Sequence, residues 1–146
     1  MFVDTVRFGR LEVAAKKILL FPDGLVGFED DKHWILLADG ESESVGWLQS
    51  IGNAELALPV VTPQRFISDY SLRMKRTELK SLPWKAEDQA IVLVVVSHSQ
   101  RRLTMNLKAP LVINLNRCLG KQVISVGGQP LKYEFPLQSD SVRQSA

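Results

Sequence analysis

The sequence predicts a mostly β protein of a single domain, an antiparallel β-barrel or sandwich of about nine or ten short strands with one short helix. Three observations predict this class. Apolar and polar residues alternate with a period of two in several segments, turn-forming residues separate those segments, and only the stretch 77–82 has helical signals. The length of 146 residues suits one domain with one core.

The clearest alternation runs from Tyr70 to Lys75, where apolar and polar residues take turns. The pattern returns in Leu103–Lys108 and in Leu111–Asn116, which Pro110 separates because proline cannot donate to a ladder. The β-branched, uniformly apolar block Ile91–Val96 is typical of a strand covered on both faces. We expect that block at the centre of the core.

The other expected strands are β-branched or aromatic segments bounded by turn residues such as Pro22-Asp23-Gly24 and Gly127-Gly128. They are Val3–Val13 with a break at Gly9, Lys17–Phe21, His33–Ala38, Val45–Ile51, Leu56–Val61 and Lys121–Val126.

One helix is expected over 77–82. Thr77 is a capping residue, Glu78 suits the positive end of the helix dipole, and Pro83 ends the segment. Residues 1–137 are expected to form the β domain. The tail 138–146, rich in serine and glutamine, has too little apolar surface to order itself and is expected to be flexible.

The composition narrows the class of protein. The formal net charge is +2, from 18 basic and 16 acidic side chains, which is too small for a dedicated polyanion binder. The single cysteine, Cys118, excludes an internal disulfide. The N-terminus has no signal-peptide pattern, and the longest apolar run, Ala90–Val96, is far short of the ~20 residues that cross a bilayer. We expect a cytoplasmic protein without a membrane segment.

Reactive residues are sparse. The stronger metal ligands are His33, His98 and Cys118, and no zinc spacing relates them. The acidic run Glu29-Asp30-Asp31 is interpreted as a solvated loop, and Cys118 as a small buried residue. The sequence therefore predicts no catalytic residues, no bound metal, no cofactor and no enzyme activity.

Nucleic-acid binding is the alternative function. Basic residues gather at Lys16-Lys17, Arg73–Arg76 and Arg101-Arg102, and a small β-barrel with a basic stripe and exposed aromatic rings could bind single-stranded RNA. The tryptophans Trp34, Trp47 and Trp84 have apolar neighbours, however, which favours core packing. Direct nucleic-acid binding is therefore not the first expectation.

Ile18–Glu29 reads as a strand running into F-P-x-G-L-x-G-F-E, and Trp47–Ser50 reads W-L-Q-S. Both segments resemble motifs of the FliW family. Leu56–Tyr70 is similar to its apolar strand, proline and D-Y segment, Asn106–Asn114 to N-L-x-A-P-x-V-I-N, and Gly120–Val123 to G-x-Q-V. The likeness spans about residues 3–126.

The resemblance implies a flagellar assembly factor that acts by binding proteins. A FliW-like protein would bind the translational repressor CsrA and stop it from silencing flagellin messenger RNA, and would bind flagellin in competition with CsrA. Such a switch needs two alternative complexes and no catalysis. We expect the chain alone to be monomeric.

The candidate binding residues fall in three groups. The first is the loop Gly24, Leu25, Gly27, Phe28 and Glu29, whose apolar pair either packs into the core or is offered to a partner. The second group is Phe66, Asp69 and Tyr70. The third is the polar ladder face Asn106, Lys108 and Asn114, for which a plain surface is the alternative.

Overall fold

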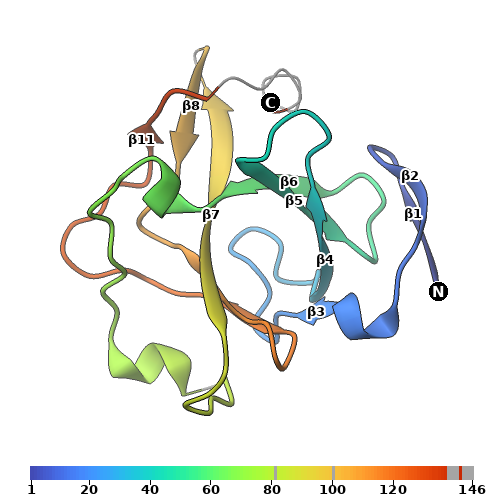
Figure 1. The fold of residues 1–146 in the computed structure, drawn as a ribbon, viewed down its shortest axis with the longest axis horizontal. Coiled ribbons are helices and arrows are strands. Elements are labelled where there is room, and N and C mark those ends of the chain that lie inside the picture. Colours follow the sequence, from blue (N-terminus) through green and yellow to red (C-terminus); the bar gives the residue numbers. More distant parts are fainter. Residues whose placement is uncertain (81, 100, 138–141, 143–146) are drawn as a thin grey trace.

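The computed structural model describes residues 1–80, 82–99, 101–137 and 142, and eleven strands lie within these ranges (Figure 1). They are β1 (Phe2–Thr5), β2 (Gly9–Glu12), β3 (Leu19–Leu20), β4 (His33–Ala38), β5 (Val45–Ser50), β6 (Ala57–Val61), β7 (Ala90–Ser99), β8 (Arg102–Met105), β9 (Leu111–Asn114), β10 (Leu119–Gln122) and β11 (Tyr133–Glu134). Three short 3-10 helices connect them: η1 (Ala15–Lys17), η2 (Pro63–Arg65) and η3 (Arg76–Leu79).

Seven of the strands close into a ring. The nine-stranded sheet has the order β11-β8-β7-β6-β5-β4-β3-β10-β9, and β9 also pairs with β7, from Ala90↔Asn114 to Leu93↔Leu111. The pairings are antiparallel except for the single parallel pair Leu119↔Leu20 between β10 and β3. The predicted mostly β, single-domain fold is confirmed.

Strand β7 organises the sheet because it is long enough to pair with three neighbours. Its first half pairs with β9, its centre pairs with β6 through Val60↔Val95 and Val61↔Val94, and its last part pairs with β8. In Figure 1 it crosses the middle of the molecule from bottom to top. The block Ile91–Val96 is central in the sheet, as predicted, although Ile91, Val92 and Val95 are only half-buried.

Alternation along the ring strands divides the core in two. Inner residues from six ring strands and two residues of the β3–β4 connection form one buried cluster: Leu19, Phe21, Leu25, Trp34, Leu48, Val60, Leu93, Leu111 and Ile113. Residues on the opposite face form the second, which contains Trp47, Val61, Val94, Val96 and Met105. The separate β1–β2 hairpin buries Val3 and Val13 against Ile35. Both faces of the sheet are therefore covered, as the apolar strands predicted.

The segment Tyr70–Lys75 is not the predicted strand. It is extended, and Tyr70, Leu72 and Met74 do point inward, but its one β-contact is the isolated bridge Met74↔Ser125. Alternation indicates only that one side of a segment is buried. The buried side of this segment packs on the sheet, but its backbone joins no ladder. The sequence pattern therefore predicted the facing correctly and the pairing wrongly.

Four further expectations differ from the structure. The predicted helix over 77–82 is one turn of 3-10 helix, η3, and Trp84, expected in the core, is 42% exposed. Strand β10 begins at Leu119 instead of Lys121, and β11 was not expected. The tail 138–146 lies outside the described residues except for Val142, which is buried in the second cluster. No helix among the described residues is long and apolar enough to span a membrane.

Candidate functional site

The loop between β3 and β4 folds back on itself in two successive turns. Gly24 N donates to Phe21 O at 2.8 Å, and Phe28 N donates to Leu25 O at 2.7 Å. Leu25 is 2% exposed and half-buried Phe28 packs beside it on the inner cluster, so both apolar side chains point into the ring. These two side chains anchor the loop in the core, and the residues between them, Val26 and Gly27, are exposed at its tip.

Gly24 is the residue that allows this turn. Its φ is +68°, a left-handed value that side chains disfavour, and a Cβ placed there would lie 2.6 Å from the Glu29 Cα. The backbone of Glu29 therefore passes directly over Gly24. The Glu29 side chain is exposed and accepts from Gly27 N at 3.1 Å, which holds the second glycine of the turn.

The tip of the loop is Val26, which sequence reasoning missed. It is 71% exposed, and its N–H donates to Gln122 Oε1 of β10 at 2.8 Å. Gln122 in turn donates from Nε2 to Ala109 O at 3.0 Å. An exposed valine on a loop clamped by a glutamine from a distant strand is presented in one conformation. The sequence signal that could have identified Val26 is an apolar residue placed between the two turn glycines, Gly24 and Gly27.

A groove of about 440 Å³ adjoins the tip. Leu25, Val26 and Phe28 form one wall, and Gln122 lies beside them. The opposite wall comes from the point where β6 and β7 diverge after the pair Val60↔Val95. It is apolar at Leu58, Pro59, Val95 and Val96, and polar at Ser97 and His98. Pro59 has no N–H and cannot continue the β6–β7 ladder. The groove therefore lies where β6 and β7 stop pairing.

The structure brings together part of the predicted first and third groups. Leu25, Phe28 and Asn106 all line this groove. Asn106 uses its Oδ1 to accept from Lys108 N and Ala109 N, both at 3.1 Å, so its side chain shapes the turn after β8. Lys108 is exposed in that turn.

Asn114 lies elsewhere and inside the molecule. It is fully buried in β9, donating from Nδ2 to Pro83 O at 3.3 Å and to Asp88 Oδ2 at 2.9 Å. These two bonds hold the 83–89 loop against the barrel.

The second predicted group lies on a different side of the sheet. Phe66 is half-buried, and its ring packs against Phe135 with centroids 4.7 Å apart. Asp69 is exposed, while Tyr70 is 8% exposed and its hydroxyl has no hydrogen-bond partner in the described part of the chain. Burial raises the pKa of Tyr70 above its usual value of 10.0. Tyr70 borders a separate hollow of about 280 Å³.

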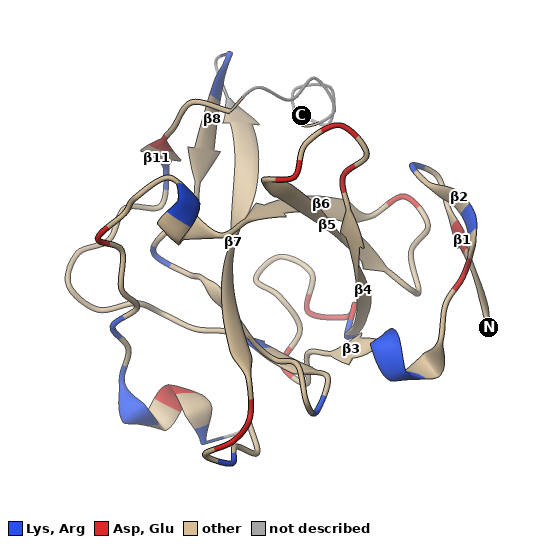
Figure 2. Cartoon of the chain, in the orientation of Figure 1, with Lys and Arg blue, Asp and Glu red and all other residues tan. Residues whose placement is uncertain are grey.

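The basic clusters are spread over the molecule. Lys16 and Lys17 lie on η1, the Arg73–Arg76 segment leads into η3, and Arg101 and Arg102 form the β7–β8 turn; Figure 2 places these three blue regions at different edges. Arg102 is also bound through Nη1 to both carboxylate oxygens of Glu134, at 2.9 and 3.0 Å. The clusters do not form the continuous stripe that an RNA groove requires.

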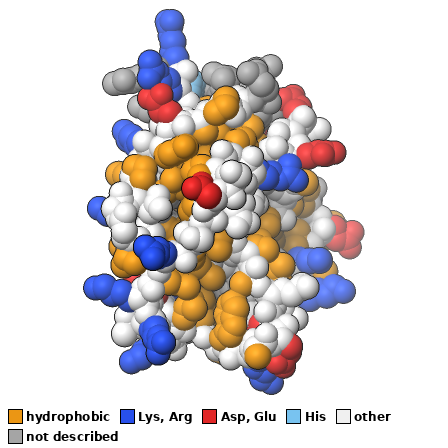
Figure 3. Space-filling view, turned by 60° about the vertical axis from the view of Figure 1, so that its left-hand side comes forward, with side chains coloured by type: hydrophobic (Ala, Val, Ile, Leu, Met, Phe, Trp, Pro, Cys, Tyr) orange, Lys and Arg blue, Asp and Glu red, His pale blue; other side chains and the backbone are white. Residues whose placement is uncertain are grey.

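Apolar side chains gather on another face. Figure 3, which brings the left side of Figure 1 forward, shows a broad hydrophobic band bordered by lysine and arginine. Exposed Ile124, Val126 and Leu131 come from the connection between β10 and β11. Exposed apolar area of this kind is typical of surfaces that contact other proteins.

The described residues contain no group of three or more His, Cys, Asp or Glu side chains placed to hold a metal ion. The Cys118 thiol donates to Lys16 O at 3.0 Å.

Comparison with known proteins finds relatives that match most of the chain. The family model described as "FliW protein" matches residues 3–137. The flagellar assembly factor FliW of Natranaerobius thermophilus is 33% identical over 127 residues, which cover 85% of this chain and 84% of that protein. The FliW of Lachnoclostridium phytofermentans is 37% identical over 129 residues, covering 85% and 83%. A crystal structure of the flagellar assembly factor FliW aligns with a TM-score of 0.86 and 28% identity over 95% of this chain and 100% of that one.

Proposed function

The chain belongs to the FliW family of flagellar assembly factors, and from this premise we propose that it is a cytoplasmic switch that binds either CsrA or flagellin. Bound to CsrA, it prevents repression of flagellin translation. Bound to flagellin, it releases CsrA. The family is one of flagellar assembly factors. In this proposal the regulation comes from exchange of protein partners.

We infer that the partners meet at the Val26 tip and its groove. The observation that carries this proposal is that the exposed apolar side chain of Val26 adjoins a mostly apolar groove of about 440 Å³. Apolar contacts at the centre of an interface supply most of its binding free energy. The Gln122 clamp holds the tip before binding, which reduces the conformational entropy lost on association.

Binding of each partner tests the proposal. Purified chain is expected to form a complex with purified CsrA and, separately, with purified flagellin in pull-down and calorimetry at micromolar concentrations. Recovery of neither partner would contradict the proposed function.

A matched pair of valine variants tests the surface. Val26→Asp places a charge at the proposed contact and is expected to weaken binding of at least one partner by about tenfold or more. Val6→Asp is the control, because Val6 is also 71% exposed but lies in the β1–β2 turn. Equal affinity of V26D and V6D for both partners would show that the interface is not at this loop. The proposed binding of two partners would not be contradicted by that result.

A further inference from the structure

A second groove, of about 540 Å³, lies on a different part of the barrel. Its walls come from the connection between β2 and β3, from β4, and from the turn between β9 and β10. It shares no lining residue with the Val26 groove, and its lining includes Glu12, Lys16, Lys17, Leu36 and Leu115.

The β4 wall of this groove is an open sheet edge. His33 O accepts from Ile51 N at 2.9 Å and Asp39 N donates to Val45 O at 3.2 Å, so the odd-numbered residues of β4 bond to β5. In an antiparallel ladder the alternate residues direct their N–H and C=O groups to the other side. Leu36 and Ala38 therefore point theirs away from β5.

No described strand covers those groups. Strand β3 pairs with β4 only at Leu19↔Trp34 and Leu20↔His33, and stops before Leu36. The chain preceding β3 is instead coiled into η1, where Lys17 N donates to Ala14 O at 2.9 Å and Ile18 N to Ala15 O at 3.2 Å. The 3-10 turn satisfies its own donors and leaves the edge of β4 without a neighbouring strand.

On the side of η1, the side chains around the edge combine apolar surface with positive charge, while Glu43 and Arg65 share a neighbouring hollow with Leu36 and Ala38. Leu36 is 38% exposed and Leu115 is 41% exposed. Lys16 and Lys17 are exposed, and neither forms a salt bridge within the described residues. Glu12 is the one carboxylate among the lining residues. A strand that entered here would need apolar residues toward the groove and carboxylates toward the lysines.

We propose that the β4 edge is a strand-addition site for an extended, acidic segment of a partner protein. The segment would pair with the backbone of Leu36 and Ala38, as peptides do on exposed sheet edges. Its apolar side chains would contact Leu36 and Leu115, and its carboxylates would pair with Lys16 and Lys17. Lysines beside an edge disfavour neutral or basic strands, so they make the edge selective for acidic ones.

Charge also argues against a second copy of this chain. The charged lining residues are two lysines and one glutamate, so two β4 edges would bring like net charge together. An RNA strand is disfavoured because the groove is lined by aliphatic side chains without an aromatic platform for bases. The acidic segment is the occupant that satisfies backbone, apolar surface and lysines together.

Amide hydrogen exchange followed by NMR tests the site, and it needs neither CsrA nor flagellin. The probe is a synthetic peptide of alternating valine and glutamate, about seven residues long, and the control peptide replaces glutamate with lysine. In the free chain the amides of Ile35 and Leu37 are expected to be protected and those of Leu36 and Ala38 to exchange quickly. The acidic peptide is expected to protect Leu36 and Ala38.

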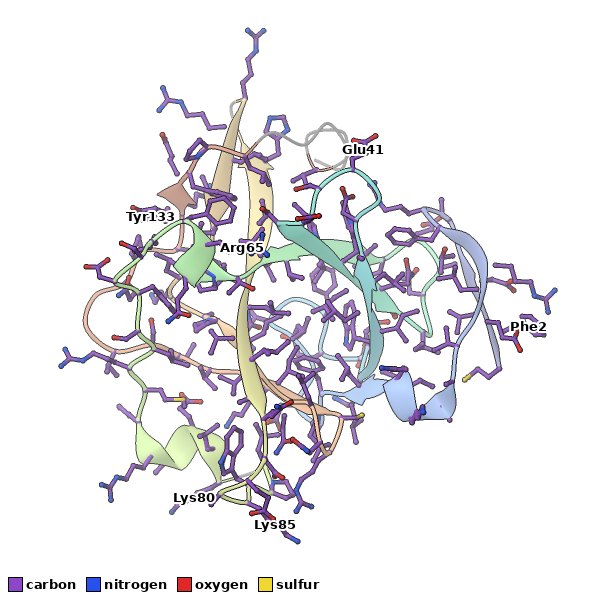
Figure 4. The ribbon with its side chains drawn as sticks, viewed as in Figure 1. Phe2, Glu41, Arg65, Lys80, Lys85 and Tyr133 are labelled. Atoms are coloured by element: carbon purple, nitrogen blue, oxygen red, sulfur yellow. The ribbon has the colours of Figure 1, made fainter. Side chains whose placement is uncertain are left out.

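Charge variants complete the test. Lys16→Glu with Lys17→Glu is expected to weaken binding of the acidic peptide by about fivefold or more. The control double variant, Lys85→Glu with Lys132→Glu, makes the same change in net charge at exposed sites outside the groove and is expected to bind like the wild type; Lys85 lies at the lower end of the view in Figure 4. Circular dichroism confirms that each variant is folded.

Four results would overturn the proposal. They are no protection of Leu36 and Ala38 at about 1 mM acidic peptide, equal binding of the two peptides, equal loss of binding in the two double variants, and displacement of the peptide from these amides by an oligouridine RNA. Protection of the same amides that rises with protein concentration alone would assign the edge to a second copy and would also contradict it.

Discussion

Gly24 shows how one residue without a side chain positions the proposed contact. The substitution Gly24→Ala would place a methyl group 2.6 Å from the Glu29 Cα at a φ of +68°. It is expected to lower the free energy of unfolding by about 2–4 kcal/mol, combining the backbone penalty with a steric clash. Urea unfolding followed by tryptophan fluorescence measures the change.

Gly27→Ala is the control for that substitution. Gly27 has a φ of +88° but nothing within 4 Å of its hypothetical Cβ, so the variant should lose only the backbone term, about 1 kcal/mol. Similar losses in G24A and G27A would mean that the Glu29 backbone moves aside and that the close approach does not hold the loop.

Asp88 gives a prediction about pH. Its carboxylate accepts from the Asn114 amide at 2.9 Å, from Lys85 N at 3.0 Å and from Arg117 Nε at 3.0 Å. These contacts, led by the Asn114 amide, lower the pKa of Asp88 below 3.8. Asp88 therefore stabilises the fold fully above that pH, and the contribution is lost as the pH falls through the lowered pKa.

Comparison with Asp88→Asn measures this effect. The wild type is expected to be more stable than D88N at pH 7, and the difference should shrink below about pH 4 as the aspartate becomes protonated. Urea unfolding at a series of pH values gives the difference directly. A stability gap that stayed constant down to pH 2.5 would show that the charge of Asp88 does not contribute.

For single residues, the sequence predicted burial correctly inside the strands and less well where loops pack against them. Trp34 and Trp47 are fully buried as expected, whereas Trp84, which follows Leu82 and Pro83, is 42% exposed. Asn114 looked like the polar side of a strand, but its amide is turned inward to bond the 83–89 loop. Both differences depend on loops that fold against the strands, which no local pattern encodes.

Among the elements, the 70–75 segment is buried on one side without being paired in a β-ladder. Its alternation places Tyr70, Leu72 and Met74 inward, but only Met74 forms a bridge. Backbone amides without ladder partners open with little free-energy cost. We expect the amides of Ser71 to Lys75 to exchange at least about a hundredfold faster than those of Val60 and Val94, which lie in paired central strands.

Hydrogen exchange under native conditions measures these rates. Protection of 71–75 equal to that of Val60 and Val94 would indicate a continuous strand at this position, as the alternation predicted, and would correct the structural description. The comparison is internal to one sample, so it requires no variant.

Strand β4 is the element in which sequence and structure agree most closely. The predicted bounds, His33–Ala38, are those observed, because the apolar segment ends at the Asp39-Gly40 turn. Strand β3 was predicted as Lys17–Phe21 and is Leu19–Leu20. Local propensity did not reveal that residues 15–17 coil into η1, and that difference creates the open edge of β4.

At the scale of the whole molecule, the closed ring depends on contacts between distant segments. The β7–β9 and β3–β10 pairings join residues far apart in the sequence, as Leu20 and Leu119 are. Alternation and turn residues predicted most of the strands and the barrel or sandwich class. They did not predict strand order, because periodicity specifies which face of a strand is buried and not which strand lies beside it.

The same closure explains why the candidate loop could be predicted only in part. The Gly24–Glu29 motif predicted a turn, but the clamp on Val26 comes from Gln122, on a strand that meets the loop only in the folded ring. The groove likewise requires β6 and β7 to diverge. The loop residues could therefore be identified from the sequence, but the Gln122 contact and the groove beside the loop could not.

The central claim, that this chain is a switch between two protein partners, is tested most directly by a competition titration. A preformed complex with labelled CsrA is titrated with flagellin, and fluorescence anisotropy reports the free CsrA. We predict that CsrA is released in proportion to the flagellin added and that V6D behaves like the wild type. Retention of CsrA at saturating flagellin, with both proteins bound to one chain, would contradict the account.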